Sequence, residues 1–321
     1  MKFPARLVTV LLCLSLKSAL ASAATSPKEL LAAGRVDEVI ESLQTRISRQ
    51  PDDADSHNLL CRAYFMLEEW DRGIAECERA TKLAPDVARY HLWLGRIYGE
   101  KADRASFLSA AGLAKKVRTE FERAVELDPN EWEARVVLAE FYLEAPGIVG
   151  GGKDKARAQA EALDKLRPAM AHYVRGRISE KEKDNAAAER EYRAAIDASG
   201  GGAHAWLNLA LFFRHENRFE EMEQALRTMD TRPLDDPESL MDGGSVILRS
   251  GHDYALGIHL VEHYLDNDPV EAGPVFKAHY ILGQLFEKQE DKKSAAERYR
   301  AALALAHDFT RAREALKRLE H

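Results

Sequence analysis

Apolar positions recur along the chain at the spacing of helices that bury one face. Residues 91–98 read HLWLGRIY, and residues 121–129 read FERAVELDP. In both segments apolar side chains fall three or four positions apart, which predicts an amphipathic helix. Closely similar patterns return later, as HYILGQLF at 279–286 and SAAERYRAALAL at 294–305. The chain is therefore predicted to be all-α and built from pairs of helices.

A regular period underlies these pairs, and prolines mark it. Pro51, Pro85, Pro129 and Pro168 are separated by 34, 44 and 39 residues. The second and third gaps are one 34-residue period with insertions of ten and five residues. A period of 20 to 50 residues is typical of stacked units, each too small to bury its apolar face alone.

Within a unit, a small residue on the first helix is matched by a large residue on the second. The first helix holds a small residue where the second helix must come close, and the second helix holds a large side chain that fills the space between them. The small residues are Gly95, Ala139, Gly176, Ala210 and Gly283. With the 34-residue period, this motif resembles the tetratricopeptide-repeat family over about residues 27–307.

The resemblance implies the whole architecture. We expect a right-handed superhelical solenoid of about eight helix–turn–helix units with a concave inner face and a C-terminal capping helix. The expected units are 27–51, 54–85, 88–129, 132–168, 169–200, 203–233, 237–268 and 276–307, with the capping helix at 309–320.

The first 23 residues have the pattern of a secretory signal peptide. Lys2 and Arg6 precede the ten-residue apolar run LVTVLLCLSL, and the small residues ASA follow at 21–23. Ten residues are too few to cross a bilayer of about 30 Å as a helix. We expect cleavage near Ala24 and an exported protein, periplasmic or secreted, without stable membrane insertion. An uncleaved anchor is the alternative.

The charge balance argues against nucleic acid as a partner. The chain has 46 basic and 53 acidic residues, and loss of Lys2, Arg6 and Lys17 with the signal would change its net charge from −7 to −10. Proteins that bind nucleic acid neutralise its phosphates with Lys and Arg. No nucleic-acid partner is expected.

Two cysteines remain after the signal, and both lie in unit 54–85. Cys61 takes the small position of the first helix and Cys77 the aromatic position of the second. A disulfide in an oxidising compartment would close a loop of about 15 residues, worth on the order of 3 kcal/mol. The two positions are expected about one turn out of level, with Cα atoms more than about 7 Å apart. We therefore favour two buried thiols, with the disulfide as the alternative.

Residues 147–154, GIVGGGKD, match the phosphate-loop pattern G-x-x-x-x-G-K-[ST] except that Asp154 replaces the final hydroxyl residue. A phosphate loop follows a strand, whereas a predicted helix precedes this segment. We expect an enlarged helix–helix turn with Asp154 as the N-cap of the next helix. Weak anion or partner contact at that helix N-terminus is the alternative.

Residues 259–263, HLVEH, match the zinc-peptidase pattern H-x-x-E-H. Histidines four positions apart share a helix face and could hold zinc. The segment is, however, the second helix of a repeat, and no third ligand is evident. We expect packed or exposed histidines here, with adventitious surface metal binding as the alternative. No metal, cofactor or catalytic residue is predicted.

In tetratricopeptide-repeat proteins the first helices line the concave groove where partners bind. Arginine beside tyrosine and asparagine suits recognition of carboxylates and of peptide backbone. A plain solvated face is the alternative. The candidate partner-binding residues are Asn58, Arg62, Arg96, Tyr173, Arg177, Arg214, Arg249 and Tyr280.

A second candidate surface comes from the two insertions. The extra residues near 101–115 and the enlarged turn at 145–154 lie in consecutive units and should project from one edge of the array. The resemblance implies a non-enzymatic scaffold or adaptor of the cell envelope, which binds a protein or peptide in its groove or on this edge. A small-ligand or transporter-associated binding subunit of the periplasm is the alternative.

Overall fold

The structure is a computed structural model that describes residues 26–234 and 236–320, apart from the side chains of residues 107 and 108. The expected signal peptide at 1–23 lies outside the described residues. Within them the secondary structure is entirely helical, with 17 α-helices, one short 3₁₀ helix and no strand.

The helices follow one another in pairs. The first half of the array contains α1 (Pro27–Ala32), α2 (Val36–Arg49), α3 (Ala54–Met66), α4 (Trp70–Leu83), α5 (Ala88–Ala102), α6 (Phe107–Leu127), α7 (Trp132–Glu144), the 3₁₀ helix η1 (Gly147–Val149) and α8 (Lys153–Leu166). The second half contains α9 (Pro168–Glu182), α10 (Asn185–Ala198), α11 (Ala203–His215), α12 (Phe219–Met229), α13 (Glu238–Ser250), α14 (Tyr254–Leu265), α15 (Val275–Lys288), α16 (Lys292–Leu305) and α17 (Thr310–Leu319). Each expected unit range contains two of these α-helices, to within one residue at the ends.

The small residues lie where the paired helices come closest. A Cβ atom added to Gly95 of α5 would lie 2.4 Å from the ring of Phe121 on α6. One added to Gly283 of α15 would lie 2.3 Å from the ring of Tyr299 on α16. The absence of a side chain at these positions is therefore what permits the close packing of each pair.

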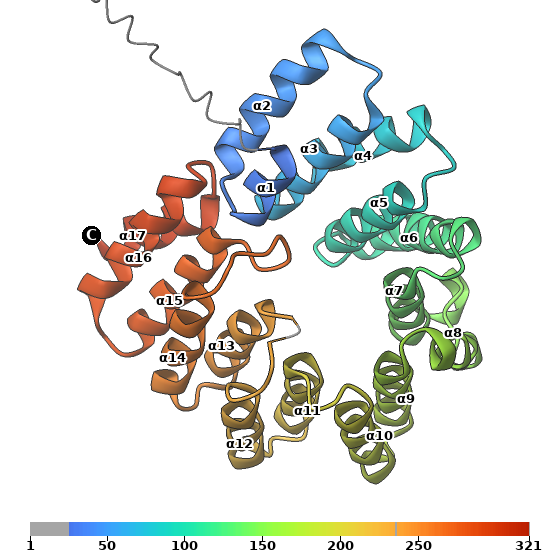
Figure 1. Ribbon diagram of the computed structural model, residues 1–321, viewed down its shortest axis with the longest axis vertical. Coiled ribbons are helices and arrows are strands. Elements are labelled where there is room, and N and C mark those ends of the chain that lie inside the picture. The colour runs from blue at the N-terminus through green and yellow to red at the C-terminus, as the bar shows by residue number, and fades with distance from the viewer. Residues whose placement is uncertain (1–25, 235, 321) are drawn as a thin grey trace, which may run out of the picture.

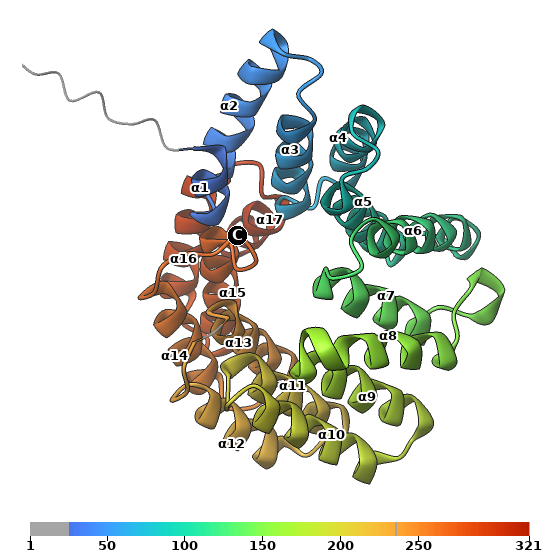
Figure 2. The ribbon, with the colours of Figure 1, turned by 45° about the vertical axis from the view of Figure 1, so that its right-hand side comes forward.

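The pairs are arranged as a ring (Figures 1 and 2). Figure 1 shows α5, α7, α9, α11 and α13 toward the inside, with α8, α10, α12, α14 and α16 on the outside. The N-terminal helices α1 to α3 lie beside the C-terminal helices α15 to α17 in both views. The array therefore returns to its own start.

Buried contacts join the two ends. Phe276 and Phe309, from the C-terminal end, share one buried cluster with Leu30 and Leu31 of α1. At the turn after α1, a Cβ atom on Gly34 would lie 2.8 Å from the backbone nitrogen that begins α15. Ion pairs add to the contact, from Asp37 to His307 at 2.8 Å and from Glu68 to Arg311 at 3.0 Å.

Helix α17 has an exposed side that carries basic residues, as expected of a capping helix. Its other side, however, is covered by the rest of the protein. Ala312 and Ala315 on its other side are fully buried. Phe309, just before it, packs edge-on against Phe276 and Tyr280, with ring centroids 5.1 and 5.2 Å apart. The terminal helix thus helps to close the ring.

None of the described helices combines the length and the apolar character needed to cross a bilayer.

Candidate functional site

The inner face of the ring contains a cavity of about 610 Å³. Its walls come from α3, α5, α7, α9, α11, the start of α13 and the loop between α14 and α15. Apolar side chains and charged side chains both line it. The apolar ones are Leu92, Trp93, Trp132, Val136, Val137 and Met170.

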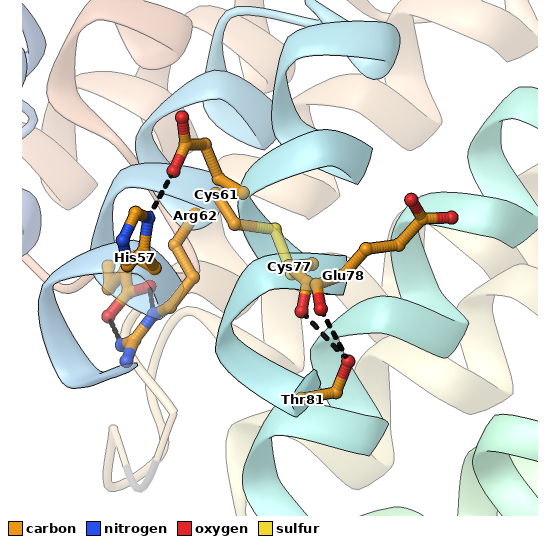
Figure 3. Close-up of a disulfide and its surroundings, with 8 residues drawn as sticks. His57, Cys61, Arg62, Cys77, Glu78 and Thr81 are labelled. Atoms are coloured by element: carbon orange, nitrogen blue, oxygen red, sulfur yellow. Dashed lines mark hydrogen bonds and ion pairs between the residues drawn. A yellow bond between two sulfur atoms is a disulfide. The ribbon is translucent and has the colours of Figure 1, made fainter. Parts of the chain in front are cut away.

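Arg62 lies in this wall and is held by a residue from the far end of the chain. Its Nε donates to a carboxylate oxygen of Glu271 at 2.6 Å, and its terminal nitrogen donates to the other oxygen. Glu271 belongs to the loop that connects α14 to α15, and Figure 1 shows this loop turned toward the N-terminal half. The predicted groove residue is present, but the protein's own carboxylate already occupies it (Figure 3).

Trp93 lies near two guanidinium groups. The Arg62 and Arg96 guanidinium carbons are 5.1 and 4.9 Å from the centre of its ring, within range of cation–π attraction. Arg96 also pairs with Glu133 of α7 at 2.9 Å. Trp93 was not among the predicted site residues. The sequence does indicate its place, because Trp93 lies three residues before the predicted Arg96 and therefore on the same face of α5.

Tyr173 and Arg177 form the next part of the wall, on α9. The Tyr173 hydroxyl donates to Glu140 at 2.5 Å and accepts from Arg177 at 3.1 Å. Arg177 is also paired with Glu144 at 2.8 Å and Glu180 at 3.2 Å. Burial and the Glu140 carboxylate both raise the pKa of Tyr173, so this hydroxyl remains a donor at neutral pH.

Arg214 and Arg249 differ from the other candidate arginines. Among the described residues, neither side chain makes a hydrogen bond or an ion pair, and the Nε of Arg214 is buried without an acceptor. Desolvation and the charge of Arg214 both lower the pKa of Arg249, and only Asp242 opposes them. Arg249 is exposed to solvent, so water as well as Asp242 offsets its charge.

Two predicted groove residues are packed against neighbouring helices. Asn58 is fully buried, and both polar atoms of its side chain lack a hydrogen-bond partner. Tyr280 packs against Tyr299 and Phe309, with ring centroids 5.7 and 5.2 Å apart. Helical position alone placed them in the groove, but packing between neighbouring helices buries the first and holds the second in the ring-closing cluster.

Cys61 and Cys77 are joined in a disulfide, with Cα atoms 5.3 Å apart (Figure 3). Both residues are fully buried between α3 and α4. The expectation of two thiols beyond bridging distance is therefore wrong. The two residues lie opposite each other across the pair of helices. Gly176 and Tyr192, at the same two positions of a later unit, are also in contact.

The segment 147–154 is a turn between helices, but Asp154 is not its cap. Helix α7 ends at Glu144, and α8 begins at Lys153 after an N-cap at Gly152 that has no side chain. Asp154 lies within the first turn of α8 and pairs with Arg157 at 2.6 Å. It lies too far along the chain to cap the helix, because α8 already begins directly after Gly152.

The two insertions meet at one edge of the ring, as expected from their places in consecutive units. An apolar cavity of about 400 Å³ lies between them, lined by Ala110, Ala111, Ala114, Phe141 and their neighbours from α5, α6, α7 and η1. Ile148, on its rim, is 90% exposed. We call this region, residues 99–117 and 141–149, the insertion edge.

The histidines of HLVEH face a single carboxylate. His259 lies 2.8 Å from one oxygen of Asp230, and His263 lies 2.7 Å from the other. No group of three or more His, Cys, Asp or Glu side chains in the described part of the chain has the arrangement to hold a metal ion.

Comparison with known proteins identifies the repeats. Residues 30–97 match the family described as tetratricopeptide repeat, and residues 181–235 match it again. A mouse relative, Superkiller complex protein 3 of Mus musculus, is 24% identical over 293 residues. That match covers 88% of this chain but only 18% of the length of the relative.

Solved structures were compared with the chain as well, and yeast Tom70 shares its fold. Yeast Tom70 aligns with a TM-score of 0.54 at 13% identity, over 89% of this chain and 58% of its own. A tetratricopeptide-repeat protein of Thermus thermophilus aligns with a TM-score of 0.48 at 15% identity, over 58% of this chain and 97% of its own. Residues 30–97 and 181–235 therefore match tetratricopeptide repeats, and the chain folds as the all-helical solenoid that its 34-residue period predicts.

Proposed function

We propose that the chain is an exported, non-enzymatic interaction scaffold of the cell envelope, which holds a protein or peptide on the inner face of its ring or on the insertion edge. Proteins with tetratricopeptide repeats are generally scaffolds for protein–protein interaction, which supports the binding role. The signal-peptide pattern of residues 1–23 supports export.

The observation that carries the binding role is the composition of the inner cavity. It combines two tryptophans, Trp93 and Trp132, with arginines on the neighbouring helices. Tryptophan and arginine are the side chains that most often dominate the energy of a protein interface. Paired carboxylates hold several of these arginines in place, so their ordering cost on binding is reduced.

Site-specific photo-crosslinking in the cell envelope tests the proposal. A photoreactive residue at Val136 probes the inner face, and one at Ile148 probes the insertion edge. The control position is Arg190, which is exposed on the outer helix α10. We expect an adduct of defined mass from position 136, position 148 or both, and none from position 190. Equal labelling at all three positions, or none at any, would contradict the scaffold role.

Export is tested separately by sequencing the N-terminus of the protein recovered from the envelope fraction. We expect the chain to begin near Ala24. Recovery of the chain with residues 1–23 still attached would contradict cleavage.

The small-ligand alternative needs an enclosed apolar pocket inside the superhelix. The inner cavity instead has a charged wall, from Arg62 to Glu271, and the apolar cavity lies at the insertion edge. The scaffold role is therefore favoured. A thermal-shift screen separates the two, because stabilisation by a small molecule alone would support the alternative.

A further inference from the structure

Ile148 is an exposed apolar side chain on the rim of the insertion edge. It is 90% exposed, and no other large hydrophobic side chain in the described part of the chain is exposed in this way. Its neighbour Val149 is only 4% exposed, so the turn directs one apolar residue inward and the other into solvent. A single exposed apolar residue is common on soluble proteins and identifies no binding site by itself. Its significance depends on the surface around it.

The turn holds Ile148 in a fixed position. In the 3₁₀ helix η1, the nitrogen of Val149 donates to the carbonyl of Pro146 at 3.0 Å. The carbonyl of Val149 in turn accepts a hydrogen bond from Arg118 of α6 at 3.3 Å. The backbone on either side of Ile148 is therefore ordered before any binding takes place, which lowers the entropic cost of forming an interface.

A cavity lies directly beside this side chain. Its volume is about 400 Å³, and Ala110, Ala111 and Ala114 of α6 line it opposite Phe141 of α7. The short alanine side chains leave this space open. Because a cavity of about 150 Å³ already admits benzene, this one is large enough for an aliphatic side chain such as that of Ile148.

The insertion edge therefore carries a protruding apolar side chain and an apolar cavity side by side. A contact between two identical surfaces related by a two-fold axis requires that each surface be complementary to itself. A surface with both features meets this requirement, because each copy can insert Ile148 into the cavity of the other. An unrelated partner would need only one of the two features.

The charges of the insertion edge are also self-complementary. Asp103 lines the cavity, and Lys115 follows Ala111 by four positions on the same face of α6. Both side chains are exposed, and neither forms an ion pair within the described part of the chain. The edge has four basic and three acidic residues, whereas the whole chain has a net charge of −7. Repulsion between two acidic chains is therefore weak at this surface.

The size and place of the insertion edge suit an interface. It comprises 19 residues of the first segment and nine of the second, and among its described side chains only Val117, Tyr142 and Val149 are buried. Each partner contributes about 20–30 residues to an interface of standard size. Figure 2 shows the turn between α7 and α8 on the opposite side of the ring from α1 and α17, so a contact here leaves ring closure undisturbed.

We propose that two copies of this chain bind each other through the insertion edge. A two-fold axis relates the copies, Ile148 of each enters the cavity of the other, and Asp103 of each pairs with Lys115 of the other. This inference goes beyond the scaffold role and does not depend on it. The resulting dimer leaves the inner face of both rings free for a partner.

Sedimentation velocity of the purified chain over a range of concentrations tests the contact. We expect the wild type to shift from the mass of one chain to twice that mass as the concentration rises. Ile148→Asp places a carboxylate in the apolar cavity and should weaken self-association at least about tenfold. The control Arg190→Asp, at an exposed position of α10, should leave it unchanged. A wild type that keeps the mass of one chain up to its solubility limit would overturn the proposal, as would equal association of Ile148→Asp and the wild type.

Mixing two variants tests the reciprocal fit. Ala111→Trp fills the cavity but keeps Ile148, whereas Ile148→Asp removes the inserted side chain but keeps the cavity. A dimer of either variant with itself loses both contacts, and a mixed dimer retains one of them. We therefore expect the mixture to associate at least about tenfold more tightly than either variant alone. No gain on mixing would overturn the reciprocal arrangement.

Melting temperatures show whether these variants fold. Ile148 is exposed and Ala111 lines a cavity, so neither substitution should lower the melting temperature appreciably. If Ala111→Trp does not fold, Ala114→Leu, which fills the same cavity with a smaller side chain, takes its place in the mixture.

Charge reversal tests the second contact. Asp103→Lys and Lys115→Asp should each weaken self-association severalfold, because each brings like charges together at two places in the dimer. The two substitutions combined should restore it. Asp103 is the C-cap of α5, where a lysine is favourable for the helix, so its replacement should not unfold the chain. A double variant that associates no better than the single ones would contradict this pairing.

Photo-crosslinking identifies the occupant of the edge in the cell envelope. A photoreactive residue at Gly147 keeps Ile148 in place, and an added Cβ atom there meets nothing within 4 Å. We expect an adduct of twice the mass of one chain, and none when Ile148→Asp is added. An adduct with a different protein, or a crosslink that stays within one chain, would overturn the assignment to a second copy.

Discussion

At the scale of single residues, the disulfide replaces a packing contact that other units make with different side chains. Cys61 and Cys77 are separated by 16 positions, as are Gly176 and Tyr192 in a later unit. A Cβ atom on Gly176 would lie 2.9 Å from the Tyr192 ring, so these two positions touch across the helix pair. Alignment of the units therefore indicates that Cys61 and Cys77 lie close together. Helical spacing alone led to an expected distance between their Cα atoms that was too long.

Removing the disulfide should lower stability without changing the fold. We expect Cys61→Ala with Cys77→Ala to lower the free energy of unfolding by about 2–4 kcal/mol, because the unfolded chain gains the freedom of the opened loop. Urea unfolding measures this. A reducing agent should shift the wild type toward the variant and leave the variant unaffected. Two free thiols found by peptide mapping of the native protein would refute the bridge.

A second residue-scale feature repeats with the period. The Nε2 of His91 lies 2.8 Å from the carbonyl oxygen of Pro85, and its Nδ1 lies 2.6 Å from a carboxylate oxygen of Glu120. His57 makes the same two contacts, with Pro51 and Glu76, one unit earlier. In the unit after His91, Arg135 donates to the carbonyl of Pro129 at 2.8 Å. The residue six positions after Pro51, Pro85 and Pro129 thus ties the start of a helix to the preceding turn.

His91 should make stability depend on pH. Burial and Arg123 act to lower its pKa, but the hydrogen bonds to Glu120 and Pro85 raise it above the ordinary value. Because the pKa of His91 is higher in the folded protein, its proton stabilises the folded state. This contribution is complete below the unfolded pKa of about 6.5 and is lost as pH rises through the folded pKa. His91→Gln should therefore cost more stability at pH 5.5 than at pH 8 in urea unfolding.

The matched control for His91 is Arg135→Gln, at the same position of the next unit. Arginine stays charged throughout this range, so the cost of that substitution should not vary with pH. A cost for His91→Gln that is equally independent of pH would show that His91 does not gain a proton on folding.

At the scale of elements, the two insertions change how a helix pair is joined without changing its packing. The enlarged turn between α7 and α8 folds back on the end of α7. The Gly152 nitrogen donates to the carbonyl of Tyr142 at 2.8 Å, and Arg118 of α6 donates to the carbonyl of Val149 at 3.3 Å. The extra residues thereby form an ordered rim beside the apolar cavity, with Ile148 outermost.

The glycines of this turn should not be equivalent. A Cβ atom on Gly151 would lie 1.7 Å from the backbone oxygen of Ala145, whereas nothing lies within 4 Å of one on Gly147. Gly151→Ala should lower the free energy of unfolding by about 1–3 kcal/mol, since the backbone must move to admit the methyl group. Gly147→Ala should change it by less than about 0.5 kcal/mol. Equal values in urea unfolding would contradict the tight turn.

At the scale of the whole molecule, closure of the ring adds contacts between units far apart in sequence. In an open array each unit contacts only its neighbours. Here the first unit also packs on the last, through Leu31, Phe276 and Phe309. The loop that carries Glu271 reaches Arg62 across the same junction. Closure therefore defines the size of the inner cavity that the proposed function uses.

Phe276→Ala should open the ring. Phe276 and Phe212 are both almost fully buried, but Phe212 packs within the middle of the array. Each substitution to alanine should cost about 3–5 kcal/mol. Only Phe276→Ala should raise the radius of gyration measured by small-angle X-ray scattering. An unchanged radius in that variant, or an equal rise in the Phe212→Ala control, would refute the role of this junction.

The sequence by itself determined the type, length and pairing of the helices. Those features depend on apolar positions three and four residues apart and on small residues such as Gly95 and Gly283, all of which are local. The 34-residue period likewise fixed which inner helices would carry Arg62, Arg96 and Arg177.

Only the tertiary structure decided which of these side chains are available. Arg62 is neutralised by Glu271, 209 residues away, and Phe276 meets α1 across the closed ring. Such contacts depend on the summed curvature of all the units, because a small rotation at each interface decides whether the ends meet.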